Sequence, residues 1–281
     1  MAAKAEKKGS QLRDFVQMHK FAVAGAFFLV VLILASLFAP LPYDPELPNP
    51  GVGIAPPSSQ HWFGTDITGG DVFSRTIAAA WVDLSLALAG TLLSLLIGVP
   101  LGLATSVKKR WSDNLVRGMD AFQAFPLLIL ALVLVSLSGN KLYMVVVAIA
   151  LINIPRYMRL IRSEVLSLRE ARFMEATTAV GVPIPRSLRK HVLPNVMGMI
   201  TAQTTLTMAN AIVVIATLSF LGIGVAPPTP SWGSMIRSGS SNMVSGEWWV
   251  AFFPGLFVLL SVWILNQLSD AISDFNTRTT R

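Results

Sequence analysis

Long apolar runs alternate with short polar segments along the whole chain. A helix needs about 20 predominantly apolar residues, at a rise of about 1.5 Å each, to cross the hydrocarbon core of a bilayer. Six runs reach or approach this length: Phe21 to Ala39, Leu84 to Ser106, Met119 to Ser138, Leu142 to Pro155, Val196 to Phe220 and Trp248 to Leu265. The pattern predicts an all-α, polytopic membrane protein with six transmembrane helices.

The first run has the basic flank of a secretory signal, but it is longer than the apolar region of a signal. Pro40 also follows directly where cleavage would have to occur. We therefore expect residues 21–39 to remain as a membrane anchor.

Composition agrees with a membrane protein and limits its chemistry. Hydrophobic residues make up 53% of the 281 residues and charged residues only 13%. The lack of cysteine excludes disulfides, iron–sulfur clusters and thiolate zinc sites. His19, His61 and His191 have no carboxylate at metal-ligand spacing, so we expect no metal site.

The basic residues are distributed unevenly between the two sides of the predicted membrane. Nineteen of the 22 Lys and Arg residues lie in residues 1–20, in the second and fourth connections and in residues 275–281. Only Arg75, Lys141 and Arg237 fall on the other side. Because positive residues are retained in the cytoplasm, both termini are predicted to be cytoplasmic. This topology accounts for the net charge of +7, and we expect no nucleic-acid partner.

The predicted outer segments differ from the inner ones in composition. Residues 40–83 are rich in proline up to position 57, and a second outer loop carries the stiff sequence "PPTPSW" at residues 227–232. Proline favours extended or turn geometry over helix. These segments are either solvated connectors or a shaped docking surface for an extracytoplasmic partner.

The predicted spans hold no charge near their centres, since Asp83 and Asp120 fall at span edges, where we expect interfacial positions. Ion-coupled transporters usually bury such charges, so the driving energy is expected to enter elsewhere. Pro126, Pro155 and the sequence "GVPLG" at residues 98–102 can each bend or break a helix.

The fifth span is the most polar. Its residues Gln203, Thr207, Asn210 and Thr217 share one helical face and are candidates to line a translocation path. The alternative is that the hydroxyls bond back to carbonyls one turn earlier and that the amides fasten neighbouring helices.

A basic cytoplasmic segment at about residues 156–195 joins spans four and five. Its first part lacks helix breakers and carries an approximate apolar stripe, which predicts an amphipathic helix that continues beyond the membrane. Gly181, Pro183 and Pro185 then predict a turn before a second short helix. A rigid protrusion of this kind suits a lever that another protein pushes.

The sequence "EATTAVG", followed at fixed spacing by "HVLP", resembles the cytoplasmic signature of ABC importer permeases. The matching residues are Glu175, Ala176, Thr177, Gly181, His191, Leu193 and Pro194. The stretches "FGTDITGGDVFSRTI", "RLIRSEVLSLREARFMEA" and "LSFLGIGVAPPTPSWGSMI" resemble the second permease of dipeptide, oligopeptide and nickel importers. The resemblance runs from about Phe21 to Asp274. Departures at Gly70, Trp81, Thr177 and residues 213–217 concern the cargo rather than the architecture.

The resemblance implies half of a translocation channel in a bacterial inner (plasma) membrane, surrounded by lipid. A homologous second permease chain would complete a heterodimer, two cytoplasmic ATPase subunits would dock on the coupling helix, and an extracytoplasmic substrate-binding protein would deliver cargo. Glu175 would meet a basic residue of the ATPase. ATP and magnesium are expected on those partners, because this chain has neither a phosphate-cradling glycine loop nor a serine-hydrolase elbow. No cofactor and no catalytic activity are expected of the chain itself.

The resulting interpretation is a permease core over residues 84–274 that imports short peptides. Nickel, opines, oligosaccharides and antimicrobial peptides are alternative cargoes within the same family. An ion-coupled secondary transporter and a non-transporting membrane scaffold are the alternatives of other classes.

Overall fold

The computed structural model describes residues 18–106, 110–169 and 193–279. Regular structure in these ranges is helical. The helices are α2 (Lys20–Phe38), α3 (Val72–Thr105), α4 (Arg110–Gln123), α5 (Leu127–Leu137), α6 (Leu142–Arg169), α9 (Leu193–Phe220), α10 (Trp232–Ser240) and α11 (Trp249–Thr279). The predicted all-α class is confirmed.

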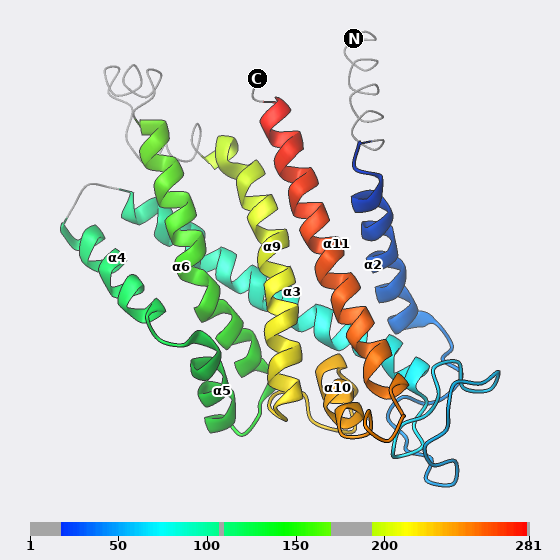
Figure 1. Cartoon of the computed structure of the whole chain (residues 1–281). Helices are drawn as coiled ribbons and strands as arrows, with labels where there is room; N and C mark the ends of the chain where they lie inside the picture. The colour runs from blue at the N-terminus through cyan, green and yellow to red at the C-terminus, as the bar shows by residue number, and fades with distance from the viewer. Residues whose placement is uncertain (1–17, 107–109, 170–192, 280–281) are drawn as a thin grey trace.

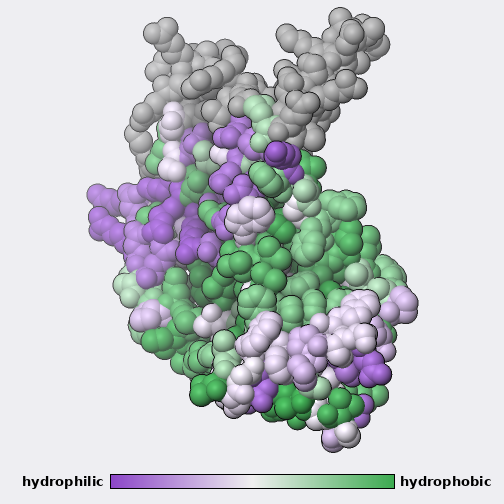
Figure 2. Space-filling view, turned by 45° about the vertical axis from the view of Figure 1, so that its right-hand side comes forward, coloured by the Kyte–Doolittle hydropathy of each residue, from purple (hydrophilic) through white to green (hydrophobic). Residues whose placement is uncertain are grey.

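Four long helices, α6, α9, α11 and α2, run side by side, and α3 crosses obliquely behind them (Figure 1). α3 packs against α6, α9 and α2, while α11 packs against α9, α10 and α2. Figure 2 shows an apolar belt around the middle of the molecule, with hydrophilic side chains gathered above it on one side and a paler, mixed surface at the lower end. This distribution is typical of a protein embedded in a bilayer.

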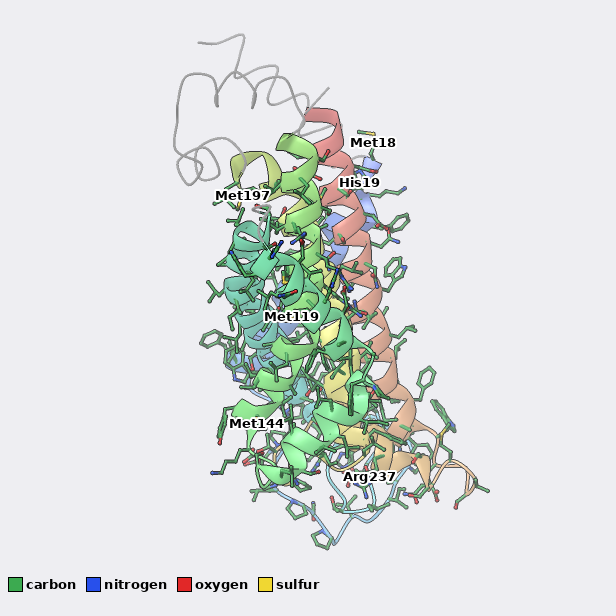
Figure 3. The ribbon with its side chains drawn as sticks, turned by 90° about the vertical axis from the view of Figure 1, so that its left-hand side faces the viewer. Met18, His19, Met119, Met144, Met197 and Arg237 are labelled. Atoms are coloured by element: carbon green, nitrogen blue, oxygen red, sulfur yellow. The ribbon has the colours of Figure 1, made fainter. Side chains whose placement is uncertain are left out.

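The helix starts alternate between two ends of the bundle. Figure 3 shows Met18, His19 and Met197 at one end, and Met144 and Arg237 at the other. The starts of α2 and α9 therefore lie opposite the start of α6 and the short helix α10. Which end faces the cytoplasm stays a prediction from the distribution of Lys and Arg.

α3 and α6 form the closest helix pair, and small residues on α3 make this possible. A Cβ atom added at Gly98 would lie 2.6 Å from Cβ of Tyr157, and one at Gly102 would lie 2.6 Å from Cβ of Ile161. Real Cβ atoms do not approach so closely, so both positions need glycine for the two backbones to meet. This interface fixes the position of α6 along about half its length.

A small apolar core, here called the inner cluster, joins α3, α6 and α9 near the end where α9 begins. It comprises Val99, Tyr157, Ile161, Val165, Val196 and Ile200. Its α6 members are spaced four residues apart, as the predicted amphipathic stripe requires. α6 does continue past the apolar run as one helix to Arg169.

The third predicted span differs most from its expectation. Instead of one helix over Met119 to Ser138, the structure has α4 and α5 meeting at a bend of 83°. Five helices are long and apolar enough to cross a membrane, or up to six if this bent pair is counted as one span. Pro126 precedes the first residue of α5, and a proline disfavours helical backbone at the residue before it, which explains the break.

The second span begins earlier than expected, at Val72 instead of Leu84. Asp71 caps the new start, since its carboxylate accepts a hydrogen bond of 2.8 Å from the backbone N–H of Ser74. Asp83 therefore lies inside α3, where it is 1% exposed instead of facing lipid headgroups. Its Oδ2 atom accepts a 2.8 Å hydrogen bond from the backbone N–H of Trp232, the first residue of α10.

Candidate functional site

Most of the predicted ATPase-coupling residues lie outside the part of the chain that the structure describes. Glu175, Ala176, Thr177, Gly181 and His191 lie outside the described residues. Leu193 and Pro194 are the first two residues of α9, where proline is tolerated because the first helical N–H groups lack intrahelical partners.

The Leu193 side chain packs against the inner cluster. The end of the coupling segment is thereby attached to the apolar contact among α3, α6 and α9. The docking role of the segment stays a prediction.

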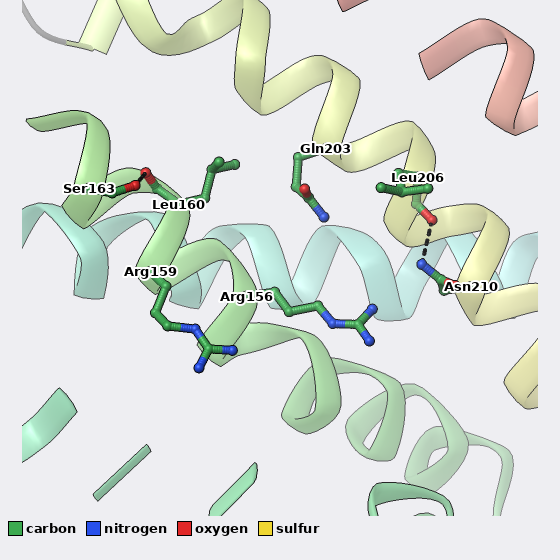
Figure 4. A pocket seen from close by; sticks show the side chains of 7 residues that line it. All are labelled: Arg156, Arg159, Leu160, Ser163, Gln203, Leu206 and Asn210. Carbon is green, nitrogen blue, oxygen red and sulfur yellow. Dashed lines mark hydrogen bonds between the residues drawn. The ribbon is translucent and has the colours of Figure 1, made fainter. Parts of the chain in front are cut away.

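A polar cavity of about 600 Å³ lies between α6 and α9 (Figure 4). Its lining residues are Arg156, Arg159, Leu160 and Ser163 from α6, and Gln203, Leu206 and Asn210 from α9. Two of the four residues predicted to line a translocation path, Gln203 and Asn210, are therefore brought together at one cavity. Whether cargo passes here stays a prediction.

The other two members of that predicted face behave differently. Thr207 is completely buried, and its hydroxyl oxygen accepts a 3.1 Å hydrogen bond from Nε2 of Gln203. This bond holds the Gln203 amide at the cavity. The Thr217 hydroxyl donates to the carbonyl oxygen of Val213 at 2.7 Å, which is the self-satisfied arrangement considered as the alternative. The predicted polar face thus carries two amides that line the cavity and two hydroxyls that form hydrogen bonds within α9.

Two arginines line the cavity from α6, and sequence reasoning missed them because it took arginine as the sign that the membrane had ended. Arg156 lies 14 residues after Leu142, or about 21 Å along the helix, which is less than the roughly 30 Å of a hydrocarbon core. The available signal was the spacing of three between Arg156 and Arg159, which places both on one side of a continuing helix.

Arg159 and the next arginine, Arg162, have carboxylate partners. An Arg159 Nη1 atom lies 3.1 Å from Oδ1 of Asp120, and an Arg162 Nη2 atom lies 2.9 Å from Oδ1 of Asp113. Both carboxylates belong to α4, so the pairs tie α4 to α6. Asp120 is thus half-exposed and paired at this helix contact, and its interfacial position stays a prediction.

Arg156 has a different environment. Its nearest polar contact is a weak hydrogen bond of 3.4 Å to Oδ1 of Asn153 on its own helix. Among the residues that the structure describes, no carboxylate lies within ion-pair distance of its guanidinium group. The side chain is exposed and extends toward the part of α9 that carries Asn210 (Figure 4).

The opposite end of the bundle carries a folded cap rather than a loose connector. Tyr43 stacks on the ring of His61 at 4.5 Å between centroids, and His61 Nδ1 lies 2.9 Å from Oδ1 of Asp71. The indole N–H groups of Trp232 and Trp249 donate to backbone carbonyls of Thr76 and Thr65. The rigid surface that results is compatible with the docking interpretation of the proline-rich segment.

In the described part of the chain, no group of three His, Asp or Glu side chains is placed to hold a metal ion. The cavity lining likewise contains only arginine, amide, hydroxyl and leucine side chains. Its chemistry is therefore that of hydrogen bonding and anion recognition.

Comparisons with known proteins extend this description. Residues 90–281 match the family described as binding-protein-dependent transport system inner membrane component, and residues 11–57 match the N-terminal TM domain of oligopeptide transport permease C. The dipeptide transport system permease protein DppC of Alkalihalophilus pseudofirmus is 36% identical over 262 residues, covering 92% of this chain and 86% of that protein.

The di/tripeptide transport system permease protein DppC of Pseudomonas aeruginosa is 36% identical over 277 residues, covering 94% of this chain and 91% of that protein. Among solved structures, an inward-facing MetNI methionine ABC transporter superposes with a TM-score of 0.57 at 16% identity, covering 71% of this chain and 97% of the matched chain. At that identity the structural likeness concerns the fold alone.

Proposed function

This chain belongs to the family of binding-protein-dependent transport system inner membrane components, and from that premise we propose that it imports short peptides. It is a multi-pass membrane permease of the ABC transporter class and is not itself an ATPase. The observation that carries the proposal is the match to dipeptide and di/tripeptide permeases over more than nine-tenths of the chain. Nickel, opines, oligosaccharides and antimicrobial peptides lack a comparable supporting observation here.

The proposed setting is a bacterial inner membrane, with the chain forming one half of the translocation pathway. A homologous permease would supply the other half, and an extracytoplasmic binding protein would deliver peptide to the folded cap. Two cytoplasmic ATPase subunits would bind ATP and magnesium. Nucleotide binding would change the spacing of the coupling segments, and hydrolysis would reset it.

The packing of α6 and α9 supports this mechanism. The segment predicted to dock on the ATPase connects the end of α6 to the start of α9. Apolar residues of the inner cluster join these two helices to α3 close to that connection. A displacement of the segment would therefore move three packed helices together instead of bending one helix by itself.

The cavity between α6 and α9 is the proposed position of the path in this half of the channel. Polar and charged side chains at membrane depth are costly in contact with lipid and usually face water or a protein neighbour. Gln203, Asn210 and Arg156 meet at one such cavity. A peptide has amide and carboxylate groups that these side chains can bind as it passes.

An arginine at membrane depth also bears on the alternative of an ion-coupled transporter. Such a transporter needs a group that gains and loses a proton or that binds a cation. Arginine stays protonated, and none of the described residues that line the cavity is a carboxylate. The arginine therefore favours recognition of an anionic group over proton coupling.

The test is reconstitution of the chain with its sister permease, ATPases and binding protein in liposomes, followed by ATP-dependent uptake of a radiolabelled dipeptide. Glu175→Arg reverses the charge at the proposed ATPase contact, and Gly181→Pro blocks the proposed turn. We expect both variants to assemble in the membrane and to lose uptake almost completely.

Glu164→Arg is the matched control, because it reverses a charge on α6 that has no proposed contact with the ATPase. Uptake at the normal rate by Glu175→Arg and Gly181→Pro would contradict the coupling mechanism. Uptake of nickel or an oligosaccharide, with none of any peptide, would contradict the cargo.

A further inference from the structure

The three arginines that follow Pro155 on α6 have unequal environments. Arg159 and Arg162 each bind a carboxylate of α4. Arg156, one turn closer to the middle of the helix, has only the weak contact with Asn153 among the residues that the structure describes. If α6 crosses the membrane from Leu142, Arg156 lies within the hydrocarbon core, where a guanidinium group without a carboxylate is costly unless a ligand binds it at some stage of function.

The direction of the Arg156 side chain argues against a lipid headgroup as that ligand. An arginine that reaches for the cytoplasmic headgroups would extend toward the Arg169 end of α6. Arg156 instead extends toward Asn210 (Figure 4). Asn210 lies ten residues before Phe220, or about 15 Å along α9, a distance equal to about half the thickness of a bilayer core.

The neighbouring side chains are suited to an anionic group. Gln203 donates one N–H to Thr207, which orients its amide, and Asn210 donates one N–H to the carbonyl oxygen of Leu206 at 3.1 Å. Each amide has a second N–H to offer. In the described ranges, no acidic side chain lines the cavity. A guanidinium group presents paired donors that match the two oxygens of a carboxylate.

We propose that Arg156, assisted by Asn210 and Gln203, binds the C-terminal carboxylate of a peptide as it passes through the membrane. This inference rests on the proposed function, because it assigns a recognition site within the proposed peptide path. The site uses a group that every short linear peptide carries, so it recognises peptides without selecting among their side chains. It is a transient binding site and changes no covalent bond.

The first experiment measures binding to the permease and ATPase complex in nanodiscs without the binding protein, so that the preferences of that protein do not enter. The probes are a tritiated dipeptide and the same dipeptide with its C-terminus amidated. We expect the acid to bind more tightly than the amide. Arg156→Gln should weaken binding of the acid by about tenfold and change binding of the amide by less than about twofold.

Arg156→Lys sharpens the result, because it keeps the charge and loses the paired donors; we expect an intermediate affinity. Arg117→Gln is the matched control. It removes an exposed arginine from α4 that does not line the cavity, and it should leave binding unchanged. Equal binding of acid and amide, or no effect of Arg156→Gln on the acid, would overturn the inference.

A second experiment tests whether Arg156 binds a lipid phosphate or an acidic residue of the sister permease instead of a peptide carboxylate. If it binds lipid phosphate, Arg156→Gln will lower the amount of anionic lipid that copurifies and leave peptide binding intact. If it pairs with an acidic residue of the sister permease, Arg156→Gln will weaken the acid and the amide equally and will loosen the heterodimer. Either outcome overturns the inference.

Different results would contradict the proposed function and the carboxylate site. If the wild-type transporter moves no peptide in liposomes, peptide import itself is contradicted. If it moves peptides and Arg156→Gln weakens binding of the acid no more than binding of the amide, only the carboxylate site is contradicted.

Discussion

Pro126 and Pro155 present the same local signal in two apolar runs, and the chain treats them differently. At Pro126 the helix breaks, and α4 and α5 meet at 83°. Pro155 lies inside α6, which continues for 14 residues beyond it. A proline removes one hydrogen bond and crowds the preceding turn wherever it occurs in a helix, so the cause of the difference lies in the surroundings.

The surroundings of α6 are dense on both sides of Pro155. Ile154 and Tyr157 are buried against the Gly98 region of α3, and Asn153 donates from its side chain to the carbonyl oxygen of Ile149 at 2.8 Å. The hinge between α4 and α5 is less covered, since Phe125 is 64% exposed. Tertiary packing therefore decides whether a proline in this chain bends its helix.

The largest effect is expected from filling the glycine contact that holds α6 against α3. In Gly98→Leu the new Cβ would collide with Tyr157 and with the carbonyl oxygen of Ile154. Separation of α3 from α6 should cost about 1 to 3 kcal/mol of folding free energy and lower the yield of assembled transporter. Thermal denaturation followed by size-exclusion chromatography measures this.

Gly118→Leu is the control for that substitution. A Cβ at Gly118 meets no atom within 4 Å, so this variant should be as stable as the wild type. Equal stability of both variants would show that the glycine contact does not hold α6.

The second-largest effect is expected from removing the break between α4 and α5. Pro126→Ala restores the missing N–H and removes the restriction on Phe125, which should allow α4 and α5 to join into a straighter helix. Spin labels on Trp111→Cys and Leu137→Cys, both exposed positions, would then move apart by roughly 10 Å. The chain has no native cysteine to remove. An unchanged distance would mean that packing against α6, and not Pro126, sets the bend.

The smallest effect is expected at the second proline. Pro155→Ala adds a helical N–H in a helix whose course is already fixed by α3, so stability should change by less than about 1 kcal/mol. Peptide uptake should stay within about twofold of the wild type. A large gain in stability would indicate that Pro155 strains α6, and a loss of uptake would indicate that this strain is used in transport.

Sequence reasoning located the five helices that are long and apolar enough to cross a membrane, because each contains a long apolar run, which needs no tertiary information. It gave Pro126 and Pro155 equal weight because their neighbours in space are not visible in the sequence. It started the second span too late, since Ser74, Thr76 and Asp83 read as polar positions and only the folded cap shows that they are buried. The nine-residue helix α10 was not predicted, because its serine and glycine residues are not typical of a helix. Its first turn is stabilised by hydrogen bonds between Ser231 and Ser234.

The candidate site was predictable in part. Gln203 and Asn210 were found by helical spacing, and the cavity confirms that they share a surface. Arg156 was not found, because a charge that ends a span and a charge that faces a cavity look alike until the neighbouring helix is placed. The coupling residues from Glu175 to His191 depend on resemblance, and no contact of theirs is described.

The glycine contact between α3 and α6 also constrains how this chain can diverge. Tyr157 occupies the room that Gly98 leaves, and Ile161 occupies the room that Gly102 leaves. A larger residue on α3 is acceptable only after a smaller one has appeared opposite it on α6. Descendants of this sequence should therefore exchange residues at these positions in linked pairs, while an open position such as Gly118 on α4 is free to change by itself.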